Sequence, residues 1–257
     1  MRAQEIYEFL NSFAPFNTAL EFDNPGLLVG DPKTEVKTVL ISLDCTIKAI
    51  EKAKQIGAEL ILTHHPVIYE PLKEVVAGTP VFECAKNGIT VISAHTNLDF
   101  CAGGVCDTLC VKAGLKSVTA TADGLRIGTV ASCAVETFAE NVGKALNYNP
   151  RFVEGKNLVQ KVAICSGSGS SFLEQAVSLG CDTLLTGDVK YSAFITASNL
   201  GVNLIDAGHF ETEQIILPVL EEKLKQAFPS LVPEIFNCNP VKTTKNHKRV
   251  KGGALVG

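Results

Sequence analysis

The segment Leu60–Pro66, with the sequence LILTHHP, decides how the rest of the chain is interpreted. An apolar run of strand type ends in His64 and His65, and the following proline stops the strand. In an open α/β sheet, functional groups lie beyond the carboxyl ends of the strands. Two histidines there could present imidazole nitrogens to a metal ion, whereas an isolated pair could equally be solvated loop residues. The choice depends on what the other strand ends carry.

Length and composition describe an ordinary globular protein. The chain has 257 residues, of which 46% are hydrophobic and 19% charged, enough for one large or two small domains. The formal net charge of −4 argues against a broad nucleic-acid-binding face, and no apolar run is long enough to span a membrane. Nine scattered cysteines without a CxxC pair, and an N-terminus unlike a signal peptide, lead us to expect a reduced, cytoplasmic protein.

The first half of the chain alternates helices and strands, and its strands end in polar groups. The expected helices are 2–13, 46–56, 79–87 and 104–112, and the expected strands are 39–44, 59–63 and 89–94. One strand ends in Asp44, and another leads into His95 and, four residues later, Asp99. The stretch 117–124, rich in Thr, Ala, Asp and Gly, is the best candidate for a domain boundary.

The second half repeats this order of elements. Residues 179–188 match 56–65, and residues 201–209 match 88–95, each with a glycine at a helix end, an apolar strand and a polar strand terminus. A chance likeness between two α/β segments is the alternative. We expect the α/β class, with two similar units, residues 1–120 and 121–240, facing each other across a metal-binding cleft. Residues 241–257 are a basic tail, expected to be disordered or an addition to the natural chain, and we assign it no function.

The last long helix is expected from His209 to about residue 226, with a kink at Pro218. His209 and Glu213 are four residues apart, so on a helix they project from one face and could bind the same metal site. Taken alone, His209 could instead cap the helix while Glu213 is solvated.

Three imidazoles and two carboxylates are therefore candidate metal ligands: His64, His65, Asp99, His209 and Glu213. This mixture of nitrogen and oxygen donors suits borderline divalent ions such as zinc, iron, manganese or cobalt. Five ligands exceed what one open catalytic site normally takes. Two ions that share one carboxylate fit the set better.

Two other groups are weaker candidates. His95 lies outside the proposed ligand set and could donate a proton or support a ligand, or it could only brace its loop. Cys101, Cys106 and Cys110 are close together in the sequence, but their helical spacing is more typical of small buried residues than of ligands.

Six motifs of the chain resemble the NIF-three-like dinuclear metal-centre family, whose members are often named GTP cyclohydrolase one type two. They are FDNPGLLVGD at 22–31, SLD at 42–44, LTHHP at 62–66, HTNLD at 95–99, LLTGDVKY at 184–191 and DAGHFETE at 206–213. The resemblance covers nearly all of the chain except the tail. It implies a metal pair held by the five candidate ligands, and a toroidal assembly of six subunits with the sites facing the interior. Ser192 departs from the family, whose members often have histidine there, so any histidine-dependent role at that position is in doubt.

Two functions are open at this point. The first is a metal-dependent hydrolase, of GTP cyclohydrolase type by resemblance, in which paired ions lower the pKa of a bound water. The second is a metal-binding scaffold or regulatory interaction protein without catalytic activity. The substrate of a hydrolase would be a small molecule of unknown identity, because no segment resembles a nucleotide-binding loop.

Overall fold

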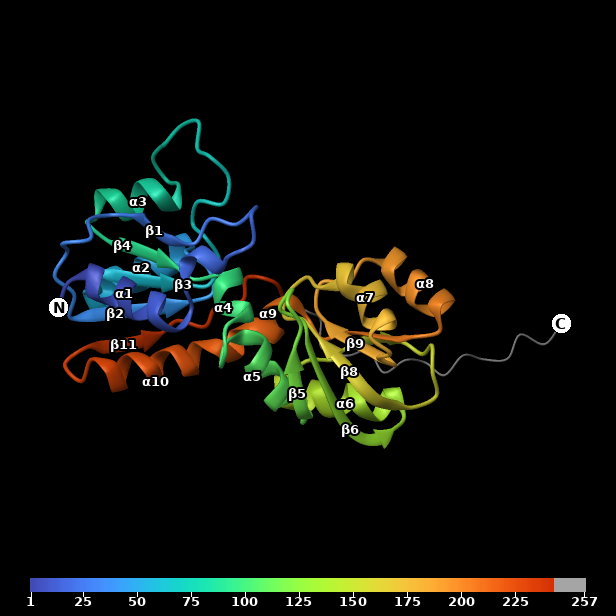
Figure 1. Ribbon diagram of the computed structural model, residues 1–257. Coiled ribbons are helices and arrows are strands. Elements are labelled where there is room, and N and C mark those ends of the chain that lie inside the picture. The colour runs from blue at the N-terminus through green and yellow to red at the C-terminus, as the bar shows by residue number, and fades with distance from the viewer. Residues whose placement is uncertain (243–257) are drawn as a thin grey trace.

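The apolar run that precedes the two histidines forms the centre of a five-stranded sheet in the computed structural model, which describes residues 1–242 (Figure 1). β3 (Leu60–Thr63) pairs in parallel with β2 (Thr38–Ser42) on one side and β4 (Thr90–Ser93) on the other. The edges are β1 (Gly26–Val29), antiparallel to β4, and β11 (Val232–Ile235), parallel to β2. Because β3 is buried on both faces, its sequence is continuously apolar rather than alternating.

Helices cover both faces of this first sheet. α1 (Ala3–Phe13) and α10 (Leu217–Ala227) pack on the face that carries Leu60 and Leu62. α2 (Ile47–Ile56) and α3 (Pro80–Lys86) pack on the face that carries Ile61. The Thr46 side chain accepts a hydrogen bond from the Ala49 backbone, so α2 begins where a capping residue predicts it.

The second sheet has six strands in the order β5-β6-β8-β9-β10-β7. These are β5 (Lys116–Ala120), β6 (Arg126–Cys133), β7 (Arg151–Val153), β8 (Val159–Ile164), β9 (Thr183–Thr186) and β10 (Asn203–Asp206). One core cluster joins it to α5 (Val105–Lys112) and α6 (Val135–Leu146), and another to α7 (Leu173–Ser178) and α8 (Tyr191–Leu200). Short 3-10 turns, η1 (Phe16–Thr18) and η2 (Ser170–Phe172), precede β1 and α7.

The two sheets share a central order of strands. β2, β3 and β4 are parallel neighbours with α2 and α3 between them in the chain, and β8, β9 and β10 are parallel neighbours with α7 and α8 between them. Each set ends in an antiparallel edge strand, β1 or β7. The α/β class is confirmed, and the common order supports the interpretation of two similar units.

The C-terminal part differs from the prediction of one kinked helix. It forms α9 (His209–Glu213), the 3-10 turn η3 (Gln214–Ile216) and then α10. Pro218 lies in the first turn of α10, where a missing backbone N–H costs little, so it helps to begin a helix instead of kinking one. α10 and β11 then complete the first sheet, although their residues were expected in the second unit.

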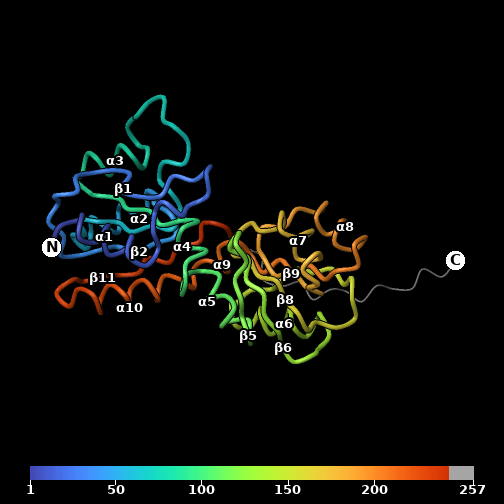
Figure 2. The backbone as a smooth tube through the Cα atoms, in the orientation of Figure 1, coloured from blue at the N-terminus to red at the C-terminus, as the bar shows by residue number. Residues whose placement is uncertain are grey.

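The junction between the two sheets positions the candidate ligands. α4 (Thr96–Phe100), α5 and α9 lie where the two halves of the molecule meet, as the tube in Figure 2 shows. The expected boundary at 117–124 contains part of β5, because only residues 121–124 form the turn to β6. None of the helices within residues 1–242 is both long and apolar enough to cross a membrane. The basic tail beyond residue 242 lies outside the described residues.

Candidate metal centre

Six side chains predicted from separate segments converge between the two sheets. His64 and His65 directly follow β3, His95 follows β4, and Asp99 lies on α4. His209 and Glu213 are the first and last residues of α9. Their ligand atoms form three overlapping groups within 4.8 Å: His64 with His65 and His95; His65 with His209 and Glu213; and His64 with Asp99 and Glu213.

Glu213 lies at the centre of this cluster and is only 3% exposed. Its Oε1 is 3.1 Å from His209 Nε2 and 3.7 Å from His64 Nε2, and its Oε2 is 3.0 Å from His65 Nε2. One carboxylate therefore faces three imidazoles. This is the arrangement expected of a carboxylate that two cations could share.

Two buried polar atoms at the centre lack a hydrogen-bond partner. His64 is completely buried; its Nδ1 donates to the Ala94 carbonyl at 2.9 Å, and its Nε2 has no hydrogen-bond partner. Glu213 Oε2 also has no hydrogen bond, since its approach to His65 is close but not in hydrogen-bonding geometry. Unsatisfied buried polar atoms are costly. A cation between them would satisfy both, so these residues fit a metal ion.

Carboxylates behind the imidazoles fix their orientation. His65 Nδ1 donates to Asp44 Oδ1 at 2.8 Å, and His95 Nδ1 donates to Asp23 Oδ1 at 2.7 Å. Histidines that bind metals usually carry such a partner on the other ring nitrogen, which fixes the tautomer and raises the basicity of the ligand. The sequence predicted a strand that ends in Asp44, but it did not indicate the hydrogen bond between Asp44 and His65. Nothing in the sequence marked Asp23 as the partner of His95.

Ser166 and Gly167 are two site residues that sequence reasoning missed. Both follow β8 in the second sheet, and the Ser166 hydroxyl donates to Asp99 Oδ1 at 2.7 Å. Gly167 has a φ of 56°, and a Cβ there would overlap Glu213 Oε1 and lie 3.3 Å from His209 Nε2. A glycine is required because the backbone approaches the carboxylate so closely. The only signal in the sequence was a glycine at a strand exit.

Charge in the metal-free cluster is held mostly as protons on the imidazoles. Burial alone would lower the pKa of His65, but the carboxylates of Asp44 and Glu213 outweigh it and raise this pKa to about 10. Burial would raise the pKa of Glu213, but the adjacent His64 and His209 hold it well below its usual value. Burial and the neighbouring Glu213 raise the pKa of Asp99. A divalent cation could take the place of these imidazole protons.

The cluster opens into a cleft of about 590 Å³. Five of the six side chains line it, namely His65, His95, Asp99, His209 and Glu213, while His64 lies behind them. An open position is typical of catalytic metal sites, whereas structural sites are closed by protein ligands. The arrangement is therefore able to admit a small molecule to the candidate metal centre.

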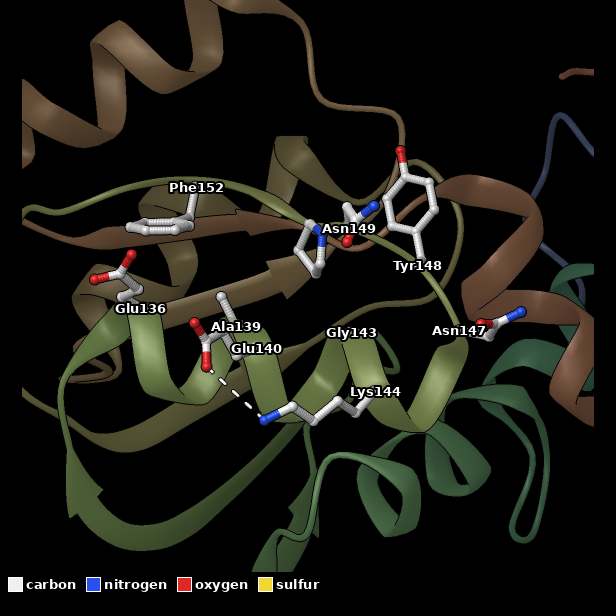
Figure 3. A pocket seen from close by; sticks show the side chains of 10 residues that line it. Glu136, Ala139, Glu140, Gly143, Lys144, Asn147, Tyr148, Asn149 and Phe152 are labelled. Carbon is white, nitrogen blue, oxygen red and sulfur yellow. Dashed lines mark ion pairs between the residues drawn. The ribbon is translucent and has the colours of Figure 1, made fainter. Parts of the chain in front are cut away.

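A second hollow lies along α6 and is a poorer candidate (Figure 3). Its lining includes the ion pair between Lys144 and Glu140, at 3.8 Å, and the rings of Tyr148 and Phe152, but neither histidine nor cysteine. Ser192 lines a separate shallow hollow against α8 and takes no part in the cluster. Cys106 and Cys110 are buried on α5, as their spacing predicted, whereas Cys101 lies before this helix and is only partly buried.

Comparisons with known proteins agree with the motifs. The model of the family Duf34/NIF3 (NGG1p interacting factor 3) matches residues 1–243. A Clostridium perfringens protein named GTP cyclohydrolase 1 type 2 homolog is 34% identical over 254 residues, which cover 92% of this chain and 96% of that protein. A protein of the same name from Methanocaldococcus jannaschii is 36% identical over 232 residues, covering 87% of this chain and 95% of the relative.

Solved structures show the same fold. Reduced HcgD from Methanocaldococcus jannaschii has a TM-score of 0.82 and 33% identity, with 91% of this chain and 97% of that chain covered. A hypothetical protein of Staphylococcus aureus has a TM-score of 0.87 and 26% identity, with 95% and 99% covered. The match over the family model and the identity to the named relatives lead to one conclusion: this chain belongs to the Duf34/NIF3 family.

Proposed function

We propose that this protein binds two divalent metal ions per subunit and acts as a metal-dependent hydrolase. The proposed ligands are the five predicted from the sequence: His64, His65, Asp99, His209 and Glu213. The observation that carries the proposal is the buried Glu213 carboxylate, which faces three imidazoles and leaves two buried polar atoms without a hydrogen bond. The relatives' name, GTP cyclohydrolase 1 type 2 homolog, supports a hydrolase.

The grouping of ligand atoms supports two ions more than one. Of the three groups, His64 with Asp99 and Glu213 and His65 with His209 and Glu213 share only Glu213. The third, His64 with His65 and His95, takes one imidazole from each of these two and adds His95. Each of the two groups that contain Glu213 offers imidazole nitrogen and carboxylate oxygen, the donors that zinc, iron, manganese and cobalt accept. Which of these ions is native is a question for elemental analysis.

The chain's own residues have distinct parts in the proposed hydrolysis. A bound ion pair would supply Lewis acidity and lower the pKa of water. Asp44 holds the His65 ring with its Nε2 toward Glu213. His95 lines the cleft with its Nδ1 bonded to Asp23, so its Nε2 is left to exchange a proton with a substrate. Removing the His95 ring would then slow turnover while both ions stay bound.

The alternative is a metal-binding scaffold or regulatory interaction protein. The family description, NGG1p interacting factor 3, refers to interaction with another protein. The open cleft beside the cluster favours the hydrolase, because a purely structural site would be closed. A toroidal assembly of six subunits in the cytoplasm is also part of the proposal, and it rests on the resemblance. Light scattering of the purified protein would test it by giving the mass of the assembly.

Elemental analysis of the protein purified without chelator tests the metal centre. We expect close to two transition-metal ions per chain, and fewer by at least one in Glu213→Gln, because the amide lacks the charge that bridges cations. Glu211→Gln is the matched control, since Glu211 lies on the same short helix but outside the ligand groups. Full metal retention in Glu213→Gln would refute the assignment. Two tightly held ions without hydrolysis of nucleotides, phosphoesters or cyclic amides would favour the scaffold.

A further inference from the structure

The cleft beside the candidate metal centre has an apolar part that metal binding does not use. The cleft has a volume of about 590 Å³, and the candidate ligands form only part of its lining. The remaining wall is mostly aromatic or otherwise apolar, and includes Leu20, Phe22, Pro66, Tyr69, Phe100 and Phe172. Cavities of this size, apolar with a few placed polar groups, are typical of sites for small molecules.

Two aromatic side chains of this wall are unusually exposed. Phe22 is 62% exposed and Tyr69 is 48% exposed, although rings of this size normally bury most of their surface. Their loops are not free, because the Asn24 side chain donates to the Ile68 carbonyl at 2.7 Å and links one loop to the other. The two loops that carry these rings are thus linked before a ligand arrives, which lowers the entropic cost of stacking on the rings.

Outside the candidate metal centre, the cleft offers no cationic side chain to a polyphosphate. No lysine or arginine is among the described residues that line it. The two loops at its mouth, residues 20–25 and 66–74, carry four carboxylates and one lysine. Phosphate chains are normally bound by arginine, lysine or metal ions. If the proposed ion pair bound the phosphates of a ligand, the same ions could not also promote hydrolysis of a ring elsewhere in that ligand.

We infer that the substrate is a flat, uncharged ring compound without a phosphate chain, which stacks on Phe22 and Tyr69. The inference rests on the proposed hydrolase function, because it places the ring beside the ion pair. Ser168 and Ser171, which also line the cleft, offer hydroxyl groups to the polar edge of such a ring. The triphosphate in the relatives' name is therefore the part of a GTP molecule that this cleft does not accommodate.

Calorimetry with matched pairs of ligands tests the inference. The probes are guanosine, adenosine, cytidine and uridine, each beside its 5′-triphosphate, titrated into the full chain both with its ions and after their removal by a chelator. We expect at least one nucleoside to bind at least about tenfold more tightly than its triphosphate in the metal-free protein. Phe22→Ala and Tyr69→Ala should each weaken that nucleoside by roughly fivefold or more, the size of a lost base-stacking contact.

Tyr191→Ala is the matched control, because Tyr191 is a 78% exposed aromatic residue that does not line the cleft. It should leave nucleoside binding unchanged. Binding of no nucleoside, tighter binding of every triphosphate, or full affinity in both Phe22→Ala and Tyr69→Ala would overturn the inference. Such a result with two ions still bound would leave the proposed metal function intact. Loss of metal binding in the wild type, with nucleosides still bound, would defeat the metal function alone.

Discussion

The carboxyl ends of the two sheets contribute to the cleft in different ways. In the first sheet, β3 and β4 end in the imidazoles of His64, His65 and His95. In the second sheet, β8 ends in Ser166 and Gly167, which offer a hydroxyl group and an exposed backbone. The same order of parallel strands therefore serves two tasks. One sheet supplies ligands, and the other supports them and makes room for them.

Glycines make this room at more than one strand end. A Cβ on Gly187, after β9, would lie 2.6 Å from the Gly208 carbonyl carbon, at the entrance to α9. The Gly187 backbone donates to the Gly167 carbonyl at 2.7 Å, so the two loops are joined. Larger residues would keep α9, and with it His209 and Glu213, away from the histidines of the first sheet. The second sheet's contribution is therefore close packing.

The largest effect on this division of tasks is expected from Gly167→Ala. The new methyl group would overlap Glu213 Oε1 and displace the proposed shared carboxylate, so at least one of the two ions should be lost. Elemental analysis after gel filtration measures this. Gly180→Ala is the control, because Gly180 also has a positive φ, 73°, but its Cβ would meet only Lys161 Nζ at 3.8 Å. Both variants should lose about 1 kcal/mol of stability from backbone strain, and only Gly167→Ala should lose metal. Equal metal content in the two would show that Gly167 has no part in the site.

A smaller effect is expected from Asp44→Asn in the first sheet. The amide would still contact His65 but would no longer hold its tautomer and basicity, so the metal affinity should fall by about 10- to 100-fold. Competition with a chelator of known affinity measures the change. Asp182→Asn is the control, because Asp182 accepts backbone hydrogen bonds from Gln160 and Lys161 at the opposite end of the second sheet. If both variants bound metal like the wild type, orientation by Asp44 would not matter.

The smallest expected step is about tenfold or less for each pH unit, in the dependence of metal affinity on pH. In the metal-free protein, the carboxylates of Asp44 and Glu213 outweigh burial and raise the pKa of His65 to about 10. An ion must displace this proton, so the affinity should rise with pH up to about 10, by up to about tenfold per unit. The stability of the metal-free protein has the opposite sign. The contribution of protonated His65 is complete below its ordinary pKa of 6.5 and is lost as the pH rises through about 10.

Chelator competition and thermal unfolding over pH 6 to 9 separate these two trends. His65→Ala should reduce both trends without abolishing them, since His64 and His209, whose pKa values the neighbouring carboxylates also raise, still titrate. An affinity in the wild type that does not change over this range would contradict proton displacement at His65. If the metal content fell at acid pH while the affinity of the remaining folded protein stayed constant, the cause would instead be unfolding of the cluster.

Much of the central architecture follows from the local sequence. Apolar runs of four to six residues, each closed by a polar group, predict buried parallel strands, and a glycine at a helix end precedes β3, β4, β9 and β10. Because functional groups collect beyond the carboxyl ends of strands in α/β folds, the sequence is enough to propose His64, His65, Asp99, His209 and Glu213 as candidate ligands. That the ends of the two sheets face each other is an expectation from the repeated order of elements. β11 escaped prediction, since a short edge strand that contains Pro233 and Glu234 lacks the continuous apolar pattern of a central one.

Local sequence patterns are sufficient to predict the α/β class, the parallel strands and the chemical character of the five candidate ligands. The tertiary structure alone decided that Ser166 bonds to Asp99 across 67 residues of chain, that Asp44 and Asp23 support His65 and His95, and that Gly167 faces Glu213. The physical reason is the range of the interactions. Strands and helices follow from hydrophobic periodicity over about ten residues, whereas a hydrogen bond or a close backbone approach between distant segments depends on how whole elements pack.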